Sequence, residues 1–136
     1  MSALLDTGFL LAAIIENDDL HEICAETLEE ETAPLLPDLV LPELAYLILR
    51  DGDYEILTDL LDAIVAGELK LLDTLPADLA RASELLKTYQ DTRIDFVDCV
   101  IVAMAERLNI TRILTVDRRH FAIVRPKHCA YFEILP

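Results

Sequence analysis

The chain has 136 residues, a length typical of one domain, and 54% of them are hydrophobic. Such a share can bury a sizeable core, so the composition excludes a largely disordered protein. Acidic residues outnumber Lys and Arg by 26 to 11, giving a net charge of −15. This charge excludes a general affinity for nucleic acid or anionic membranes, because such binding needs clustered cations.

The charge is distributed unevenly. Residues 1–92 hold 21 acids and 4 bases, whereas residues 93–128 hold 4 acids and 7 bases. Any contact with a phosphate backbone should therefore come from the second segment. There is no apolar run of membrane-spanning length and no basic segment before the first apolar stretch, so we expect neither a membrane anchor nor a signal peptide. Cys24, Cys99 and Cys129 are odd in number and are interpreted as reduced thiols, which favours a cytoplasmic protein.

Apolar runs and helical periodicities alternate along the chain. In chain order they predict a strand at 2–6, helices at 7–17 and 18–31, a strand at 33–36, helices at 42–51 and 53–68, a strand at 69–75, helices at 76–90 and 93–109, and strands at 112–117 and 131–135. We expect Thr7 to cap the first helix and Pro42 to lie in the first turn of the third. The alternation predicts one α/β domain over residues 1–136 with a mostly parallel central sheet.

Four acids are predicted at one edge of this sheet. Asp6 and Asp117 each end an apolar strand, while Glu43 and Asp98 lie near the start of a helix. The carboxyl ends of parallel strands and the first turns of the following helices share an edge, which is where ligands bind in such sheets. Carboxylates gathered this closely repel one another, and the usual compensation is a hard cation such as Mg²⁺ or Mn²⁺.

Asp95 has two interpretations. It lies three residues before Asp98, so both carboxylates can face the same way on a helix. It can equally be the N-cap of that helix, with Asp98 as the acid of its first turn. The cap is the favoured interpretation, and a metal ligand is the alternative.

Four strings along the chain carry a family resemblance. LLDTGFLLAAI, LPELAYLIL, DFVDCVIVAMAERL and ILTVDRRHF resemble the acidic motifs of PIN-domain nucleases, in particular the toxin component of VapBC-type toxin–antitoxin systems. The four acids succeed one another at separations of 37, 55 and 19 residues. The resemblance covers essentially the whole chain, and all four motifs occur in order.

The resemblance implies a site and a function. It assigns Asp6, Glu43, Asp98 and Asp117 to a catalytic Mg²⁺ or Mn²⁺ site, with Asp95 as a candidate additional ligand, and it places the hydroxyl groups of Thr7 and Thr115 beside that site. Gly8 departs from the family, which often has Ser there. The resemblance also implies a three-layer α/β/α PIN-like fold, a metal-dependent endoribonuclease toxin, a homodimer and a cognate antitoxin partner. The chemistry agrees, since carboxylate-held divalent ions activate water and shield a phosphodiester.

The segment after Asp117 is basic. We predict that Arg118 and Arg119 contact the RNA backbone beside the metal site, the alternative being a solvated loop. The acidic first part of the chain predicts a basic, amphipathic antitoxin arm that lies against the 20–31 and 54–66 helices. The apolar helices 44–49 and 97–105 are compatible with a homodimer without demonstrating it.

Other functions stay open at this point. A haloacid-dehalogenase-type phosphatase also places Asp at the first strand end, but it needs a second Asp where this chain has Gly8. A phospho-receiver module could use Asp73 but lacks a pair of acids near the first strand. Another metal-dependent phosphoester hydrolase and a catalytically silent PIN-like binding scaffold are the remaining alternatives. Zinc sites at His21 with Cys24, or at His128 with Cys129, lack a usual zinc spacing.

Overall fold

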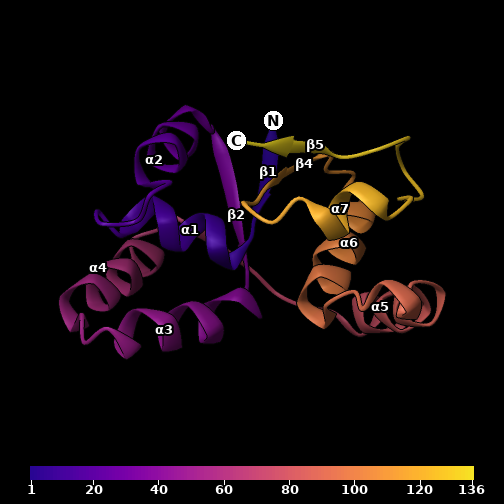
Figure 1. Cartoon of the computed structure of the whole chain (residues 1–136), viewed down its shortest axis with the longest axis horizontal. Coiled ribbons are helices and arrows are strands. Elements are labelled where there is room, and N and C mark those ends of the chain that lie inside the picture. Colours follow the sequence, from indigo (N-terminus) through magenta and orange to yellow (C-terminus); the bar gives the residue numbers. More distant parts are fainter.

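The computed structural model describes all 136 residues and is built on one sheet of five parallel strands (Figure 1). The strands are β1 (Ser2–Leu5), β2 (Ala33–Pro37), β3 (Lys70–Leu72), β4 (Arg112–Leu114) and β5 (Glu133–Leu135). Their order in the sheet is β3-β2-β1-β4-β5, and every pairing is parallel. The predicted α/β class with a mostly parallel sheet is confirmed, and the sheet is parallel throughout.

Helices cover both faces of the sheet, as a three-layer arrangement requires. They are α1 (Thr7–Ile14), α2 (His21–Glu30), α3 (Val40–Arg50), α4 (Tyr54–Val65), α5 (Pro76–Thr88), the 3₁₀ turn η1 (Gln90–Thr92), α6 (Phe96–Leu108) and α7 (Arg119–Ile123). In Figure 1, α1 to α4 lie on one side of the sheet and α5 to α7 lie on the other. No helix is both long enough and apolar enough to cross a membrane.

The core lies between the sheet and the two helical layers. Central strand β1 is buried, with Ala3, Leu4 and Leu5 fully inaccessible to solvent. This is the pattern of a parallel strand that is covered on both faces. Helix α6 is buried along most of its length, and Val100, Ile101 and Met104 are also fully inaccessible. The apolar character of this helix is therefore explained by its place in the core.

Several predicted boundaries differ from the structure. The first helix ends at Ile14 rather than at residue 17, and the second begins at His21, because a turn that includes Asp18 separates them. Thr7 is the first residue of α1 rather than its cap, since Asp6 is the N-cap. Pro42 does lie in the first turn of α3.

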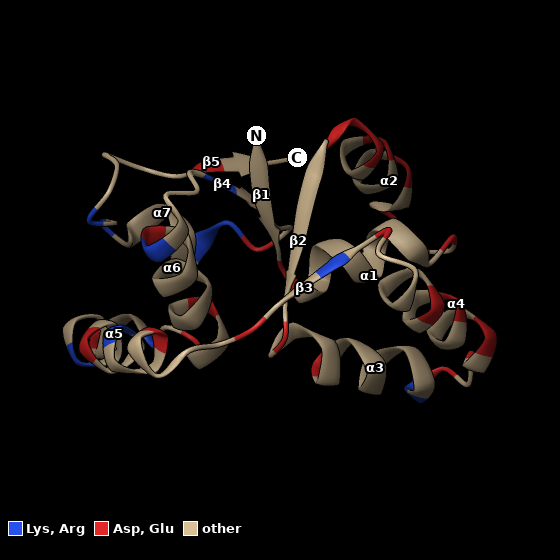
Figure 2. Ribbon diagram, turned by 180° about the vertical axis from the view of Figure 1, so that it is seen from behind, with Lys and Arg blue, Asp and Glu red and all other residues tan.

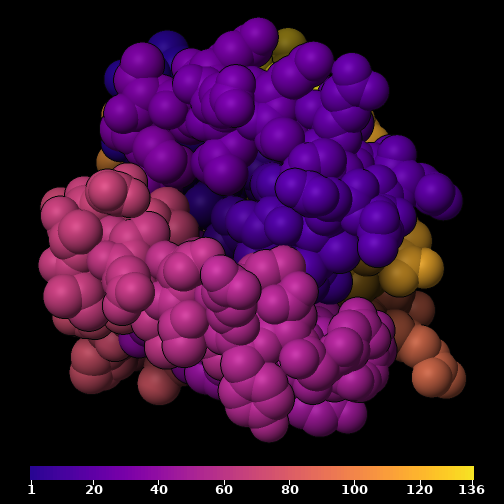
Figure 3. Space-filling model, turned by 90° about the vertical axis from the view of Figure 1, so that its left-hand side faces the viewer, coloured from indigo at the N-terminus to yellow at the C-terminus, as the bar shows by residue number.

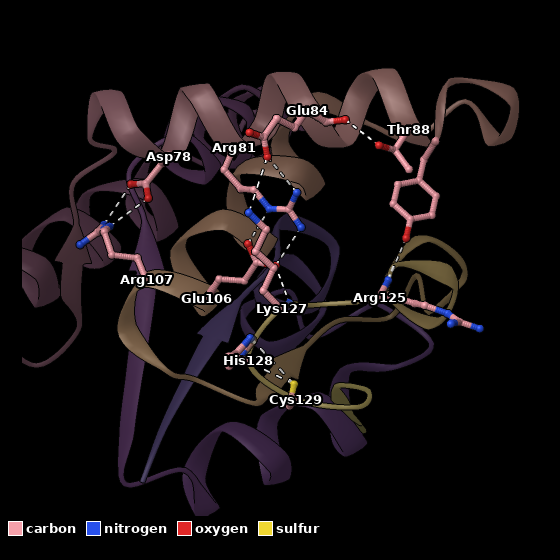
Figure 4. Close-up of polar contacts among 11 residues, drawn as sticks. Asp78, Arg81, Glu84, Thr88, Glu106, Arg107, Arg125, Lys127, His128 and Cys129 are labelled. Atoms are coloured by element: carbon pink, nitrogen blue, oxygen red, sulfur yellow. Dashed lines mark hydrogen bonds and ion pairs between the residues drawn. The ribbon is translucent and has the colours of Figure 1, made fainter.

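Helices α5 and α6 are joined by partly buried ion pairs, which Figure 4 shows. Asp78, 1% exposed, accepts two hydrogen bonds from the guanidinium of Arg107 at 2.9 and 3.0 Å. Arg81 on α5 bonds both carboxylate oxygens of Glu106 on α6, at 2.7 and 3.1 Å. Bidentate pairs of this kind fix geometry as well as adding attraction. They hold α6, and therefore Asp98 in its first turn, in one position relative to α5.

Candidate active site

The five predicted acids line one pocket at the carboxyl edge of the sheet. The pocket has a volume of about 410 Å³ and is lined by Asp6, Thr7, Gly8, Glu43, Arg93, Asp95, Val97, Asp98, Val116, Asp117, Arg119 and His120. Asp6 follows β1, Glu43 lies in the first turn of α3, and Asp117 follows β4. Parallel topology brings these positions together, as the location of the acids at strand ends and helix starts predicts.

Asp6 is held by hydrogen bonds to both of its carboxylate oxygens. Oδ1 accepts from the backbone N–H of Thr7 at 2.8 Å, and Oδ2 accepts from the hydroxyl of Thr115 at 2.8 Å. Burial raises the pKa of Asp6, while these two hydrogen bonds lower it and the charges of Asp117 and Asp95 raise it again. Asp6 therefore caps α1 and lines the pocket at the same time.

Asp98 is the most buried acid of the pocket, at 8% exposed. Its Oδ2 lies 2.7 Å from Nδ1 of His120, whose ring is itself buried. Burial and the nearby charge of Asp6 raise the pKa of Asp98 to about 7, although the hydrogen bond from His120 opposes the shift. The His120 contact fixes one oxygen of this carboxylate. Nε2 of the same ring is buried and has no hydrogen-bond partner.

Asp95 acts as the N-cap of α6. Its Oδ1 accepts from the backbone N–H groups of Val97 and Asp98, at 2.7 and 3.4 Å. This is the favoured interpretation of the sequence, and capping uses only one of the two carboxylate oxygens. Asp95 also lines the pocket, and its charge helps raise the pKa of both Asp6 and Asp98. Whether it binds a metal stays a prediction.

The two remaining acids are exposed at the mouth of the pocket. Glu43 lies with Oε2 3.5 Å from the hydroxyl of Thr7, a long contact that leaves the carboxylate free to move. Asp117 accepts from the backbone N–H of Arg119 at 3.3 Å, and its own N–H donates to the hydroxyl of Thr115 at 3.1 Å. Thr115 therefore ties Asp6 to the turn that carries Asp117.

Gly8 fits closely against the turn after β4. A Cβ at this position would lie 3.0 Å from Cγ2 of Val116. The Ser that the family often has here would require Val116 to shift by a few tenths of an ångström. The departure from the family pattern is therefore matched by the packing around Gly8.

The two arginines predicted to contact RNA have different surroundings. Arg119 lines the acidic pocket and forms no side-chain hydrogen bond or ion pair within the chain. Arg118 instead donates to the backbone carbonyls of Pro136 and Ile134, at 2.7 and 3.3 Å. An RNA contact by this pair stays a prediction, and the geometry favours Arg119.

The sequence predicts His120 only as part of the basic run beside the metal site, not as a partner of Asp98, and it does not predict Arg93 at all. His120 belongs to a basic run, and its position three residues after Asp117 places it in the following helical turn. Arg93 belongs to the link between η1 and α6, and no motif includes it. Arg93 could have been predicted from its sequence position, because it lies two residues before Asp95 in the one segment that is rich in bases.

The pocket offers oxygen ligands of the kind that Mg²⁺ and Mn²⁺ prefer. As the structure places them, however, no three His, Cys, Asp or Glu side chains stand close enough together to hold a metal ion. An ion at this pocket would therefore draw the carboxylates toward one another. The acids suit that role, because burial and like charges raise the pKa of Asp6 and Asp98 and a cation would relieve both effects.

A second, apolar groove lies away from the acids, on the face shown in Figure 3. It has a volume of about 600 Å³ and is formed by residues of α1, α2 and α4, including Leu10, Leu28 and Ile56. Its free acids are Asp59 and Glu68, both exposed. Figure 2 shows further acids along α2 and α4, the two helices that flank the groove.

The apolar helix at 97–105 faces the interior of the chain. Val100 and Met104 are fully buried there, so its apolar character is explained by the core and gives no support for a dimer surface. Helix α3 does expose Tyr46, at 67%. A homodimer stays a prediction.

Known proteins resemble this chain over nearly its whole length. Ribonuclease VapC26 of Mycobacterium tuberculosis is 29% identical over 134 residues, which is 98% of this chain and 99% of that protein. The crystal structure of M. tuberculosis VapC20, described as a Sarcin-Ricin loop cleaving toxin, superposes with a TM-score of 0.78 at 17% identity, covering 90% of this chain and 96% of that chain.

VapBC2 from Rickettsia felis, solved bound to a DNA fragment from its promoter, superposes with a TM-score of 0.71 at 22% identity, over all of both chains. The family model described as the PIN domain matches residues 3–125, a range that includes every acid of the pocket. The chain belongs to the PIN-domain family.

Proposed function

We propose that the chain is a metal-dependent endoribonuclease, the toxin of a type II toxin–antitoxin pair. The observation that carries this proposal is the pocket where Asp6, Glu43, Asp98 and Asp117 meet at the carboxyl edge of a PIN fold. The relatives support it, since one is named a ribonuclease and another a Sarcin-Ricin loop cleaving toxin. An activity on RNA, together with three free cysteines, points to action in the cytoplasm.

The proposed chemistry is hydrolysis of an RNA phosphodiester bond. Asp6, Glu43, Asp98 and Asp117 would hold one or two Mg²⁺ or Mn²⁺ ions, with the free oxygen of Asp95 as a further candidate ligand. When bound, such an ion supplies a Lewis acid that activates water and shields the charge of the phosphate.

The chain's own residues prepare this site. Thr115 and the backbone N–H of Thr7 each hold one oxygen of Asp6, and His120 holds one oxygen of Asp98, so both carboxylates are restricted in orientation. The hydroxyl of Thr7 lies beside Glu43, the ligand with the most freedom to adjust. Arg119 brings a positive charge to the rim, where a phosphate backbone must approach an acidic pocket.

We also propose that an antitoxin covers the apolar groove. Structural neighbours include toxin–antitoxin assemblies, such as a complex from Klebsiella pneumoniae with a TM-score of 0.68. An amphipathic arm would place its apolar face on Leu28 and Ile56, and a basic side chain beside Asp59 and Glu68. The charge of this surface makes a basic arm the complementary partner.

Neutralising single pocket acids should abolish cleavage. Asp6→Asn, Asp98→Asn and Asp117→Asn should each slow cleavage of total cellular RNA in Mg²⁺ or Mn²⁺ by roughly 100-fold or more, because each removes a charged ligand at nearly constant size. Asp62→Asn, on the exposed face of α4, is the matched control and should cleave normally. EDTA should stop cleavage by the wild type. Wild-type rates for Asp6→Asn would refute the site.

Asp95 can be tested without disturbing its helix. Asn caps a helix as well as Asp does, so Asp95→Asn keeps the hydrogen bonds to Val97 and Asp98 while removing the charge. If Asp95 only caps, the variant should retain cleavage within a few-fold of wild type. A loss as large as that of Asp6→Asn would make Asp95 a ligand. A wild type that cleaves no RNA with any metal would instead support a silent scaffold.

The metal-free fold should lose stability as pH rises. The pKa of Asp98 is raised to about 7 in the folded chain, so between about pH 4 and 7 the folded state holds a proton that the unfolded state has released. The stabilisation from that proton is complete below pH 4 and is lost as pH rises through 7. In EDTA at pH 8, Asp98→Asn should therefore be more stable than wild type, by roughly 1–3 kcal/mol.

Denaturant unfolding at pH 5 and pH 8 measures this difference. At pH 5 the gap between Asp98→Asn and wild type should be clearly smaller than at pH 8, since the folded state then still holds its proton and only part of the stabilisation has been lost. Asp62→Asn should show no comparable pH dependence. If the difference in unfolding free energy between Asp98→Asn and wild type is equal at both pH values, or has the opposite sign at pH 8, then ionising Asp98 does not destabilise the folded state.

Reversing the charge of the groove should weaken antitoxin binding. Asp59 and Glu68 are exposed, so Asp59→Lys with Glu68→Lys should leave the fold intact while repelling a basic arm. We expect at least a 10-fold weaker affinity for the antitoxin that co-purifies with the chain, measured by calorimetry, and a reduced dependence on salt. Asp91→Lys, outside the groove, is the control. Unchanged binding, or an acidic arm, would contradict the proposed docking.

A further inference from the structure

Two cations stand among the acids of the catalytic pocket, and one of them has no assigned role. Arg93 and Arg119 are the only Lys or Arg residues that line it. Arg119 comes from α7, after β4, whereas Arg93 comes from the link between η1 and α6. The acidic pocket is therefore approached by positive charge from two separate segments of the chain.

The guanidinium of Arg93 has no polar partner within the protein. The guanidinium groups of Arg81, Arg107, Arg112 and Arg118 are all bonded within the chain. Arg93 is exposed, and its side chain forms no hydrogen bond and no ion pair. Removing this side chain would therefore cost the fold none of its polar contacts.

Arginine is an unusual residue for the backbone conformation at position 93. Its φ and ψ are 55° and 43°, a left-handed conformation that ends the η1 turn, with its N–H donating to the carbonyl of Gln90 at 3.1 Å. Gly or Asn adopts this conformation with the least strain. The other non-glycine residue with a positive φ is Asn109, which ends α6 in the usual way. An arginine at such a position is explained by what its side chain does.

We propose that Arg93 binds a backbone phosphate of the RNA that occupies the catalytic pocket. A guanidinium matches a phosphate with two parallel hydrogen bonds and keeps its charge at any physiological pH. A free guanidinium in the same pocket as Asp95 also offsets the repulsion that the acids exert on an approaching polyanion. This inference rests on the proposed nuclease function and adds a substrate-binding residue to it.

The test separates RNA binding from cleavage and from folding. It uses an Asp98→Asn background, which the proposed function makes inactive, so that a labelled single-stranded RNA stays intact in Mg²⁺. Into this background go Arg93→Asn, Arg93→Lys and the control Arg125→Asn. Arg125 is exposed and does not line the pocket, and in Figure 4 its side chain points away from the α5–α6 contacts.

Arg93→Asn should weaken RNA binding without lowering the stability of the fold. The dissociation constant for RNA should rise several-fold, and the slope of its logarithm against the logarithm of salt concentration should fall by about 0.7, as expected for one lost phosphate contact on a single strand. The melting temperature, measured at high salt to screen the pocket charges, should stay level or rise, because Asn relieves the left-handed strain. Arg93→Lys should keep most of the salt slope.

Each outcome decides the matter. If Arg93→Asn and Arg125→Asn change the salt slope equally, Arg93 is not a phosphate contact, while the nuclease proposal stands. If Arg93→Asn weakens binding only because it melts lower, the arginine is structural and the inference fails. If Asp98→Asn itself cleaves the RNA, or if the chain binds no RNA at all, the proposed function is wrong, and the inference about Arg93, which rests on it, is wrong as well.

Discussion

The structure depends on one constraint, which is that parallel strands place their carboxyl ends at the same edge. In this chain three of those ends supply Asp6, Asp117 and, through α3, Glu43. The start of α6 adds Asp95 and Asp98, so five carboxylates line a pocket of about 410 Å³. Their mutual repulsion and their burial raise the pKa of Asp6 and Asp98. The fold can maintain such an arrangement because the core behind it, around β1 and α6, is large and well buried.

Small polar contacts decide how these acids are presented. Thr115 joins Asp6 to the turn of Asp117, and His120 joins Asp98 to α7, so residues far apart in sequence are fixed relative to one another. The ion pairs between α5 and α6 hold the C-terminal end of α6, the helix that carries Asp98 in its first turn. Hydrogen bonds therefore restrict the carboxylates of Asp6 and Asp98, and they occupy both oxygens of Asp6 but only one oxygen of Asp98.

The fold class and the gathering of the acids could be predicted from the sequence, because both depend on local pattern. An acid that interrupts an apolar strand, as at Asp6, shows where the strand ends. In a parallel sheet such strand ends lie at the same edge, so the acids are brought together. The partnership of His120 with Asp98 was not predictable, since it spans 22 residues and depends on the path of α7. The left-handed turn at Arg93 was also hidden, because no Gly or Asn marks it. The prediction of Thr7 as a cap was wrong because Asp6 performs that task as well as lining the pocket.

Calorimetric titration of the metal-free chain with Mn²⁺ shows most directly whether these carboxylates form a site for a divalent cation. We predict saturable binding near pH 6.5 that releases protons, because Asp98, whose pKa is raised to about 7, must ionise to act as a ligand. The released protons make the measured heat depend on the ionisation enthalpy of the buffer. Asp6→Asn with Asp117→Asn should abolish the saturable phase, and Asp62→Asn should keep it. If that double variant titrates as the wild type does, or if the wild type shows no saturable binding, the carboxylate pocket is not a metal site.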